Sequence, residues 1–156
     1  MAHYRDAVTN YDLLNLGDFE FQCGAVLTDT NLAYRTYGEL NPEGSNAILI
    51  AVPVNGTHQD AASIHIDGEN RAISPEKHFV IIPDMFGNGL SSSPSNTPSP
   101  FDGVDFPSVT IYDNVRAQHM LVTEELGISK LKLVTGFSMG GLQSFHWAAM
   151  YPDMVE

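Results

Sequence analysis

Three short, largely apolar runs are the clearest pattern in this chain of 156 residues. They lie at 47–52, 78–83 and 131–135. Strands that are covered on both faces have such unbroken runs, whereas half-exposed strands alternate between apolar and polar positions. Shorter β-type patterns at 19–24 and 31–37 flank the turn residues 28–31 and predict a hairpin. Residues 1–18, which precede them, are expected to form a loosely ordered lead-in segment.

A helical pattern separates the second run from the third. Thr110 can cap the start of this helix together with Asp113, and Gly127 can end it. Four positions recur between them at helical spacing: Val115, His119, Val122 and Leu126. His119 is expected to be a core residue. A second helix is expected to begin near Met139 and to end before Pro152.

Buried strands that alternate with helices predict the α/β class, with a mainly parallel, doubly wound sheet and helices on both faces. The hairpin would add antiparallel strands at one edge. The segment 85–107 has no regular pattern and is rich in Gly, Ser, Asn and Pro. A loop of this length in a compact domain is usually functional or disordered. It follows the C-terminal end of a strand, where open α/β sheets bind ligands.

Composition narrows the classes of partner. The chain has 19 acidic and 7 basic residues, a formal net charge of −12. Such a charge repels phosphate backbones and anionic bilayers, so neither nucleic acid nor a membrane is the expected partner. No leader pattern is found at 1–12, and a cytoplasmic location is expected. Cys23 is expected in a strand as a small core residue, and no metal site is expected.

The motif that carries chemistry is Gly136-Phe137-Ser138-Met139-Gly140, which has the pattern G-x-S-x-G. An expected strand precedes the motif and an expected helix follows it, as in the nucleophile elbow of serine hydrolases. Ser138 is therefore the predicted nucleophile, and the N–H group of Met139 is a predicted oxyanion donor. Gly136 and Gly140 would leave room for the sharp turn, and Gly141 would let the helix approach the sheet closely.

Two further inferences concern the surroundings of this serine. A second oxyanion donor is expected in the loop 52–57, from the N–H group of Val54 or of Asn55, although this loop could equally be a plain turn. The glycine-rich turn could also bind phosphate or only pack. However, no Lys-Ser/Thr pair follows the glycines, as it would in a phosphate-binding P-loop.

The chain resembles the homoserine O-acetyltransferase family of α/β-hydrolase-fold enzymes, and especially its esterase-like relatives. The resemblance extends from about residue 19 to the end. The matching blocks are 32–41, 46–50, 86–94, 105–107, 109–118 and 138–141, together with Trp147-Ala148 and Tyr151-Pro152.

The resemblance implies acyl transfer through an acyl-serine intermediate on Ser138, with Val54 in the position of the second oxyanion donor. The acceptor would be water or an alcohol such as homoserine, with acetyl-CoA as co-substrate in the second case and no other cofactor. Phe137 replaces the glycine usual in the acetyltransferases, and Val52 replaces a histidine. These departures favour hydrolysis of a small carboxylic ester over transfer to homoserine.

The acid and the base of a catalytic triad are not found at their expected places after Ser138. His146 lies two turns along the same helix, and His58 is the only preceding histidine near the oxyanion loop. Residues 19–156 are therefore expected to form the N-terminal portion of a hydrolase domain that is inactive, or nearly so, by itself. A third alternative is a non-catalytic remnant or subunit. A homodimer or a complementary C-terminal half is a possible partner, because the strand before Ser138 would have an open edge.

Overall fold

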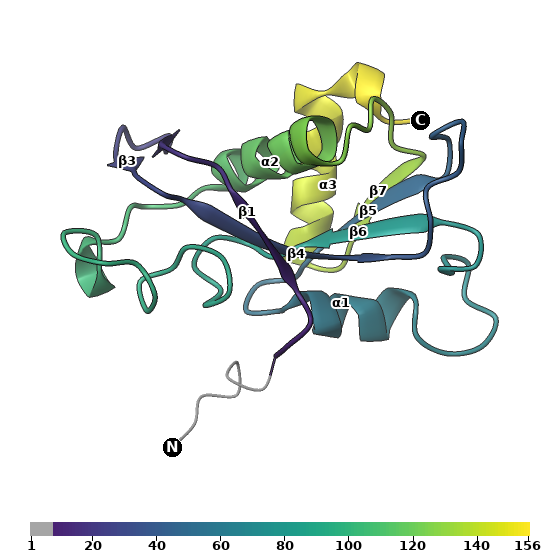
Figure 1. Cartoon of the computed structure of the whole chain (residues 1–156), viewed down its shortest axis with the longest axis horizontal. Coiled ribbons are helices and arrows are strands. Elements are labelled where there is room, and N and C mark those ends of the chain that lie inside the picture. The colour runs from purple at the N-terminus through teal and green to yellow at the C-terminus, as the bar shows by residue number, and fades with distance from the viewer. Residues whose placement is uncertain (1–7) are drawn as a thin grey trace.

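A five-stranded mixed sheet forms the centre of the computed structural model, which describes residues 8–156 (Figure 1). In spatial order its strands are β1 (Asp12–Asn15), β4 (Asn31–Tyr37), β6 (Phe79–Pro83), β5 (Ala47–Ala51) and β7 (Leu133–Gly136). The three apolar runs form β5, β6 and β7, and β5 is parallel to both of the others. β4 and β1 continue the sheet in antiparallel fashion beyond β6.

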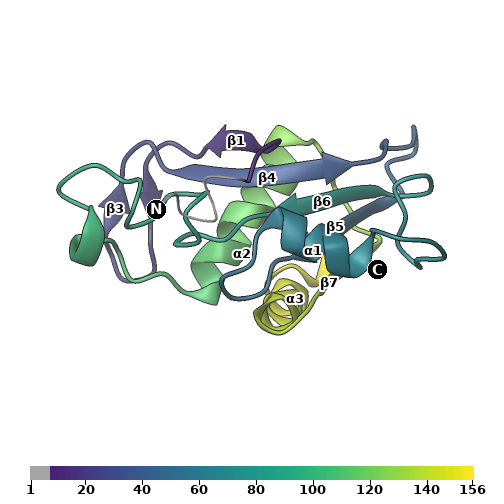
Figure 2. The same cartoon turned by 90° about the horizontal axis from the view of Figure 1, so that it is seen from below.

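Helices cover both faces of this sheet. The helices α2 (Ile111–Met120) and α3 (Met139–Met150) pack side by side on one face, and α1 (His58–His65) lies on the other (Figures 1 and 2). Alternate residues of β5 point to opposite faces, as strand geometry requires. Ala47, Leu49 and Ala51 join the core under α2 and α3, whereas Ile48 and Ile50 join the core under α1. The α/β fold class expected from the sequence is confirmed.

The expected hairpin is wrong in its strand pairing. A separate two-stranded sheet joins β2 (Phe19–Glu20) to β3 (Val26–Leu27), while β4 pairs with β1. The chain reverses between β2 and β3 at Gly24, whose φ of 86° favours glycine, whereas the predicted turn is present at Thr28 and Asp29 but leads from β3 into β4. Cys23 lies in the turn at Gly24 and is exposed, so its expected place in the core is also wrong.

The lead-in segment is more ordered than the sequence suggested, because β1 lies within it. Residues 1–7 of this segment lie outside the described part of the chain. Helix α1 was not expected. The sequence does contain a start signal for this helix, because Thr57 and Asp60 have the spacing of a capping box. In the structure the Thr57 N–H group donates to Asp60 Oδ2 at 2.8 Å.

The two expected helices are confirmed. Thr110 caps α2 and accepts a hydrogen bond from the Asp113 N–H group. The helix then widens into five residues of π-helix, Leu121–Glu125, before Gly127 turns the chain with a φ of 64°. Short 3₁₀ turns span Gly103–Asp105 and Pro152–Met154. Of the helices in residues 8–156, none has the length and apolar character needed to span a bilayer.

Candidate active site

Ser138 occupies a sharp bend between β7, which ends at Gly136, and α3, which begins at Met139. Its φ of 55° and ψ of −119° lie in a sparsely populated region for a residue with a side chain. The other non-glycine residues of the described part with positive φ are all Asn or Asp, which tolerate that conformation. Ser138 is therefore held in a strained conformation by its surroundings, with its side chain exposed to solvent.

Close packing around the bend explains two of the three glycines. A Cβ atom on Gly136 would lie 2.6 Å from the Ala51 carbonyl oxygen, and one on Gly140 would collide with the same oxygen. The start of α3 thus rests directly on the backbone at the end of β5. A Cβ on Gly141 would meet only the Gly136 oxygen, at 3.4 Å. Gly141 was expected to let the helix approach the sheet closely, but Gly140 has this role in the structure.

The N-terminus of α3 lies at this bend. Met139 opens the helix, and its N–H group has no acceptor within the helix. The N–H groups of Gly140 and Gly141 bond to the carbonyl oxygens of Phe137 and Ser138, both at 2.9 Å. The partial positive charge of a helix N-terminus favours an anion beside it. Met139 therefore meets the requirements of an oxyanion donor next to the Ser138 hydroxyl.

The loop 52–57 forms a tight turn after β5. The Gly56 N–H group donates to the Pro53 oxygen at 2.9 Å, which places Val54 and Asn55 at the corner. Asn55 has a φ of 58°, and the Val54 side chain is 52% exposed. The Val54 N–H group bonds to no other residue in the described part of the chain. It is free to donate a hydrogen bond to a ligand, as the predicted second donor must be.

Val54 and Met139 line the same surface hollow, of about 210 Å³. Asn55 of the same turn, the start of the long loop and the N-terminal end of α2 supply the rest of its wall, namely Asn55, Met85, Phe86, Gly87, Asn88, Val109, Thr110, Ile111 and Asn114. The fold thus gathers the two predicted donor residues from segments 85 positions apart in the sequence. The hollow lies at the C-terminal ends of the parallel strands, where such sheets place their ligands.

A buried polar cluster holds the C-terminal end of the loop 52–57. Asp84, directly after β6, accepts hydrogen bonds from the backbone N–H group of His58 at 2.9 Å and from its ring Nδ1 at 2.7 Å. Asn88 Nδ2 donates to Asp84 at 3.0 Å and to the Gly56 oxygen at 3.3 Å. All three side chains are buried. Asp84 and Asn88 were not expected as site residues, because only the tertiary fold brings β6 beside α1.

His58 is therefore engaged with Asp84 and forms no hydrogen bond to Ser138. Its Nε2 atom is buried and has no partner among residues 8–156. His119 stacks on Tyr151 with ring centroids 3.9 Å apart, and burial lowers the pKa of its imidazole. The His146 ring contacts the edge of Tyr112. No histidine in the described part acts on the Ser138 hydroxyl as a base in this arrangement.

The long loop is ordered by its own serines, which bond to β4. The N–H groups of Asn31 and Ala33 donate to the hydroxyls of Ser92 and Ser91, each at 2.9 Å. Ser91 in turn donates to the Asp84 carbonyl oxygen at 3.0 Å. These bonds fix the segment that follows Asp84, and with it one wall of the hollow.

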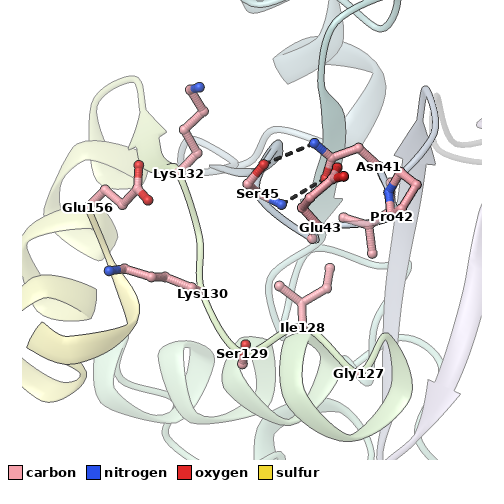
Figure 3. A pocket seen from close by; sticks show the side chains of 12 residues that line it. Asn41, Pro42, Glu43, Ser45, Gly127, Ile128, Ser129, Lys130, Lys132 and Glu156 are labelled. Atoms are coloured by element: carbon pink, nitrogen blue, oxygen red, sulfur yellow. Dashed lines mark hydrogen bonds between the residues drawn. The ribbon is translucent and has the colours of Figure 1, made fainter.

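A second hollow lies at the opposite end of the sheet, between the turn 41–45 and the segment 127–132 (Figure 3). Lys130, Lys132, Glu43 and Glu156 surround it, and their side chains are exposed. It lies beside the N-terminal end of β7, whereas Ser138 follows the C-terminal end. It holds none of the predicted site residues. Within residues 8–156, no group of three or more His, Cys, Asp or Glu side chains could hold a metal ion.

Comparison with known proteins identifies relatives of two kinds. The chain is 43% identical over 146 residues to the ethyl acetate hydrolase of Pseudomonas veronii, covering 94% of this chain and 42% of that protein. It is 40% identical over 156 residues to the homoserine O-acetyltransferase of Zymomonas mobilis, covering 90% and 41%. The crystal structure of an acetylester hydrolase from Corynebacterium glutamicum matches with a TM-score of 0.88 at 42% identity, covering 94% and 42%.

These matches confirm the resemblance to acetyltransferases and to esterase-like proteins. The chain spans about two fifths of the length of these relatives. The sequence profile of the alpha/beta hydrolase fold matches residues 61–156, which is more than half of the chain and includes the elbow at Ser138. The chain belongs to the α/β-hydrolase fold family.

Proposed function

We propose that this chain supplies the nucleophile and the oxyanion donors of an enzyme that hydrolyses small carboxylic esters through an acyl-serine intermediate. The observation that carries the proposal is the strained, exposed Ser138 at the N-terminus of α3. The similarity to an ethyl acetate hydrolase and to an acetylester hydrolase supports the substrate class. The reaction requires no cofactor, and a small-molecule ester is the proposed partner. The cytoplasmic location expected from the sequence stays a prediction.

In the proposed reaction, Ser138 Oγ attacks the ester carbonyl carbon, and its proton passes to a general base. The carbonyl oxygen becomes an oxyanion, which the N–H groups of Met139 and Val54 stabilise. When this intermediate collapses, the bond to the alcohol oxygen breaks and the alcohol leaves with a proton. Water then attacks the acyl-serine, releasing the carboxylic acid and restoring the hydroxyl. Donors of this kind typically contribute a factor of about 10²–10³ each to the rate.

The general base does not come from the described residues in their present arrangement. We therefore propose that the 156-residue chain forms the acyl-serine slowly, since loss of the acid–base pair costs several orders of magnitude in rate. A complementary polypeptide segment would supply the missing Asp and His side chains.

The alternative function is O-acyl transfer from acetyl-CoA to homoserine, which the 40% identity to a homoserine O-acetyltransferase favours. Phe137, 61% exposed beside the nucleophile, and Val52 depart from the acetyltransferase pattern. For this reason hydrolysis is the leading proposal.

The first experiment treats the 156-residue chain with a fluorophosphonate and locates the adduct by intact mass and peptide mapping. One phosphonyl group is expected on the peptide that contains Ser138, and none on the Ser138→Ala variant. Equal modification of the two proteins would overturn both enzymatic functions and leave the non-catalytic remnant.

A second experiment separates hydrolysis from transfer. The chain is acetylated on Ser138 with p-nitrophenyl acetate, and the loss of the acetyl group is followed by mass with and without homoserine. Hydrolysis predicts the same rate of loss in both samples and free acetate as product. Faster loss with homoserine, together with O-acetylhomoserine, would establish the transferase.

A further inference from the structure

A chain of buried side-chain amides connects α2, α3 and the oxyanion loop. Trp147 Nε1 donates to Gln118 Oε1 at 2.8 Å, and Gln118 Nε2 donates to Gln143 Oε1 at 2.6 Å. Gln143 Nε2 donates to the Val52 carbonyl oxygen at 3.0 Å and contacts Met85 Sδ at 3.1 Å. The side chains of Gln118, Gln143 and Trp147 are fully buried. Burial of two glutamine amides is costly unless their polar atoms are paired, and here both amides are paired.

The position of Gln143 gives this network a direct relation to the elbow. Gln143 lies on α3 five residues after Ser138, and Val52 lies two residues before Val54. The Gln143–Val52 hydrogen bond therefore joins the helix that opens with one proposed donor to the loop that presents the other. Met85, its second acceptor, lines the same hollow as Val54 and Met139.

Close packing at Gly140 also joins these two segments. Gly140 packs against the carbonyl groups of Ala51 and Val52 and fixes how near the helix can approach. Packing at Gly140 sets only a lower limit on the distance between α3 and the segment that carries Val52. A hydrogen bond also prevents the two from moving apart. Gln143 supplies this hydrogen bond at Val52, the last residue before the Pro53–Gly56 turn.

We propose that Gln143 is a positioning residue that sets the separation of the two oxyanion donors, Met139 and Val54, by holding the Val52 carbonyl group. This inference rests on the proposed function, in which both N–H groups contact the same oxyanion. A donor displaced by about 1 Å can cost as much as a hundredfold in rate, so an anchor at this place has a measurable effect on the chemistry.

The test compares Gln143→Met with Gln118→Met in the 156-residue chain. Both changes remove one glutamine amide from the same buried network and keep a similar side-chain volume. Only Gln143→Met releases the Val52 carbonyl group, whereas Gln118→Met leaves that bond in place. The two variants therefore lose a similar amount of buried hydrogen bonding, but only Gln143→Met loses the proposed anchor of the Val52 carbonyl group.

Two quantities are measured. The first is the rate constant for modification of Ser138 by the fluorophosphonate, whose phosphoryl oxygen takes the place of the oxyanion. Gln143→Met is expected to lower it by about tenfold to a hundredfold, and Gln118→Met by less than about threefold. The second is hydrogen exchange of the Gly56 N–H group, which closes the turn onto Pro53. Its exchange should accelerate in Gln143→Met and stay unchanged in Gln118→Met.

The outcomes keep the two proposals apart. If the unmodified chain fails to label at Ser138 even after prolonged treatment with excess fluorophosphonate, the proposed function fails, and hydrogen exchange of Gly56 still decides whether Gln143 holds the loop. If labelling and exchange change equally in both variants, Gln143 has only a structural role and the inference is overturned. Should Gln143→Met fail to fold, Gln143→Asn, which keeps the amide but cannot reach both neighbours, is expected to give the same two effects.

Discussion

His58 Nδ1 lies 2.7 Å from Asp84 Oδ2 in a fully buried pair that joins the first residue of α1 to the residue after β6. The same carboxylate accepts the backbone N–H group of His58 and the side-chain amide of Asn88. Asp84 thus fixes the point where the oxyanion loop ends, while Gln143 holds the point where it begins. The loop that carries Val54 is anchored at both ends by buried polar side chains.

Replacing Asp84 is therefore expected to destabilise the fold strongly. Asp84→Ala leaves buried donors on His58 and Asn88 without their acceptor, and should lower the free energy of unfolding by about 3–5 kcal/mol. Urea denaturation followed by circular dichroism measures this loss. The control is Asp102→Ala, at an exposed carboxylate, which should change stability by less than about 0.5 kcal/mol. Similar small effects in both variants would show that the cluster does not anchor the loop.

Relief of backbone strain should make Ser138→Gly more stable than Ser138→Ala. Both changes remove the hydroxyl, but only glycine adopts a φ of 55° and a ψ of −119° at little cost. The expected difference in free energy of unfolding is about 1–3 kcal/mol, measured by thermal and urea denaturation. Neither variant should react with the fluorophosphonate. Equal stability of the two variants would mean that the bend at Ser138 is not strained.

Adjacent glycines of α3 should respond differently to the same substitution. Gly140→Ala drives a methyl group into the Ala51 carbonyl oxygen, so α3 must move away from the sheet. A loss of about 2 kcal/mol or more in stability is expected, together with slower labelling of Ser138. Gly141→Ala meets its nearest atom at 3.4 Å and should be close to neutral, because alanine also favours the helix by about 1 kcal/mol. The reverse order of stabilities would contradict the packing described for the elbow.

Stability should decline as the pH falls below the ordinary pKa of histidine. Burial lowers the pKa of His119 in the folded protein, and the nearby Glu124 carboxylate partly opposes this effect. Below about pH 6.5 the unfolded chain therefore binds a proton at this site more readily than the folded chain does. The free energy of unfolding therefore falls as the pH decreases from about 6.5, and it stops falling once the pH is below the pKa of His119 in the folded protein.

His119→Phe tests this expectation, because phenylalanine keeps the ring stack on Tyr151 and does not titrate. Urea midpoints of the variant should fall less than those of the unmodified chain between about pH 7.5 and pH 5.5. His65, whose pKa is also lowered by burial and by Arg71, accounts for part of the decline that remains. An identical pH dependence in the two proteins would exclude His119 as a source.

An apolar face beside β7 should make the chain self-associate. In the described residues, β7 pairs along its length only with β5, and an isolated bridge joins Leu131 to Val155. Leu133 of β7 and Leu142 and Phe145 of α3, which packs against β7, expose apolar side chains, and Phe145 is 80% exposed. Such patches and open edges mark association surfaces.

Analytical ultracentrifugation over a range of concentrations measures this association. Phe145→Glu is expected to shift the chain toward monomer without loss of stability. Val104→Glu is the control, because Val104 is 99% exposed and lies in the long loop away from α3. If both variants associate as the unmodified chain does, this face is not the contact surface.

Local sequence determined the parts of the fold that depend on near neighbours. The apolar runs indicated β5 and β6 because strands covered on both faces need apolar residues at nearly every position, and the third run located β7, a half-exposed strand at the edge of the sheet. Thr110 and Asp113 marked the start of α2 because a capping box closes within four residues. The G-x-S-x-G pattern located the bend at Ser138 because Gly136 and Gly140 leave the room that close packing against the end of β5 requires.

The tertiary structure alone decided which segments meet. The pairing of β4 with β1 and the packing of α1 against β6 followed from contacts between segments that no local pattern encodes. Asp84 and Gln143 were missed because a buried polar side chain gains its importance from a partner far along the chain. The sequence by itself identified the serine and its helix, whereas the fold chose the residues that hold the oxyanion loop beside it, because burial requires each polar atom to find a partner in space.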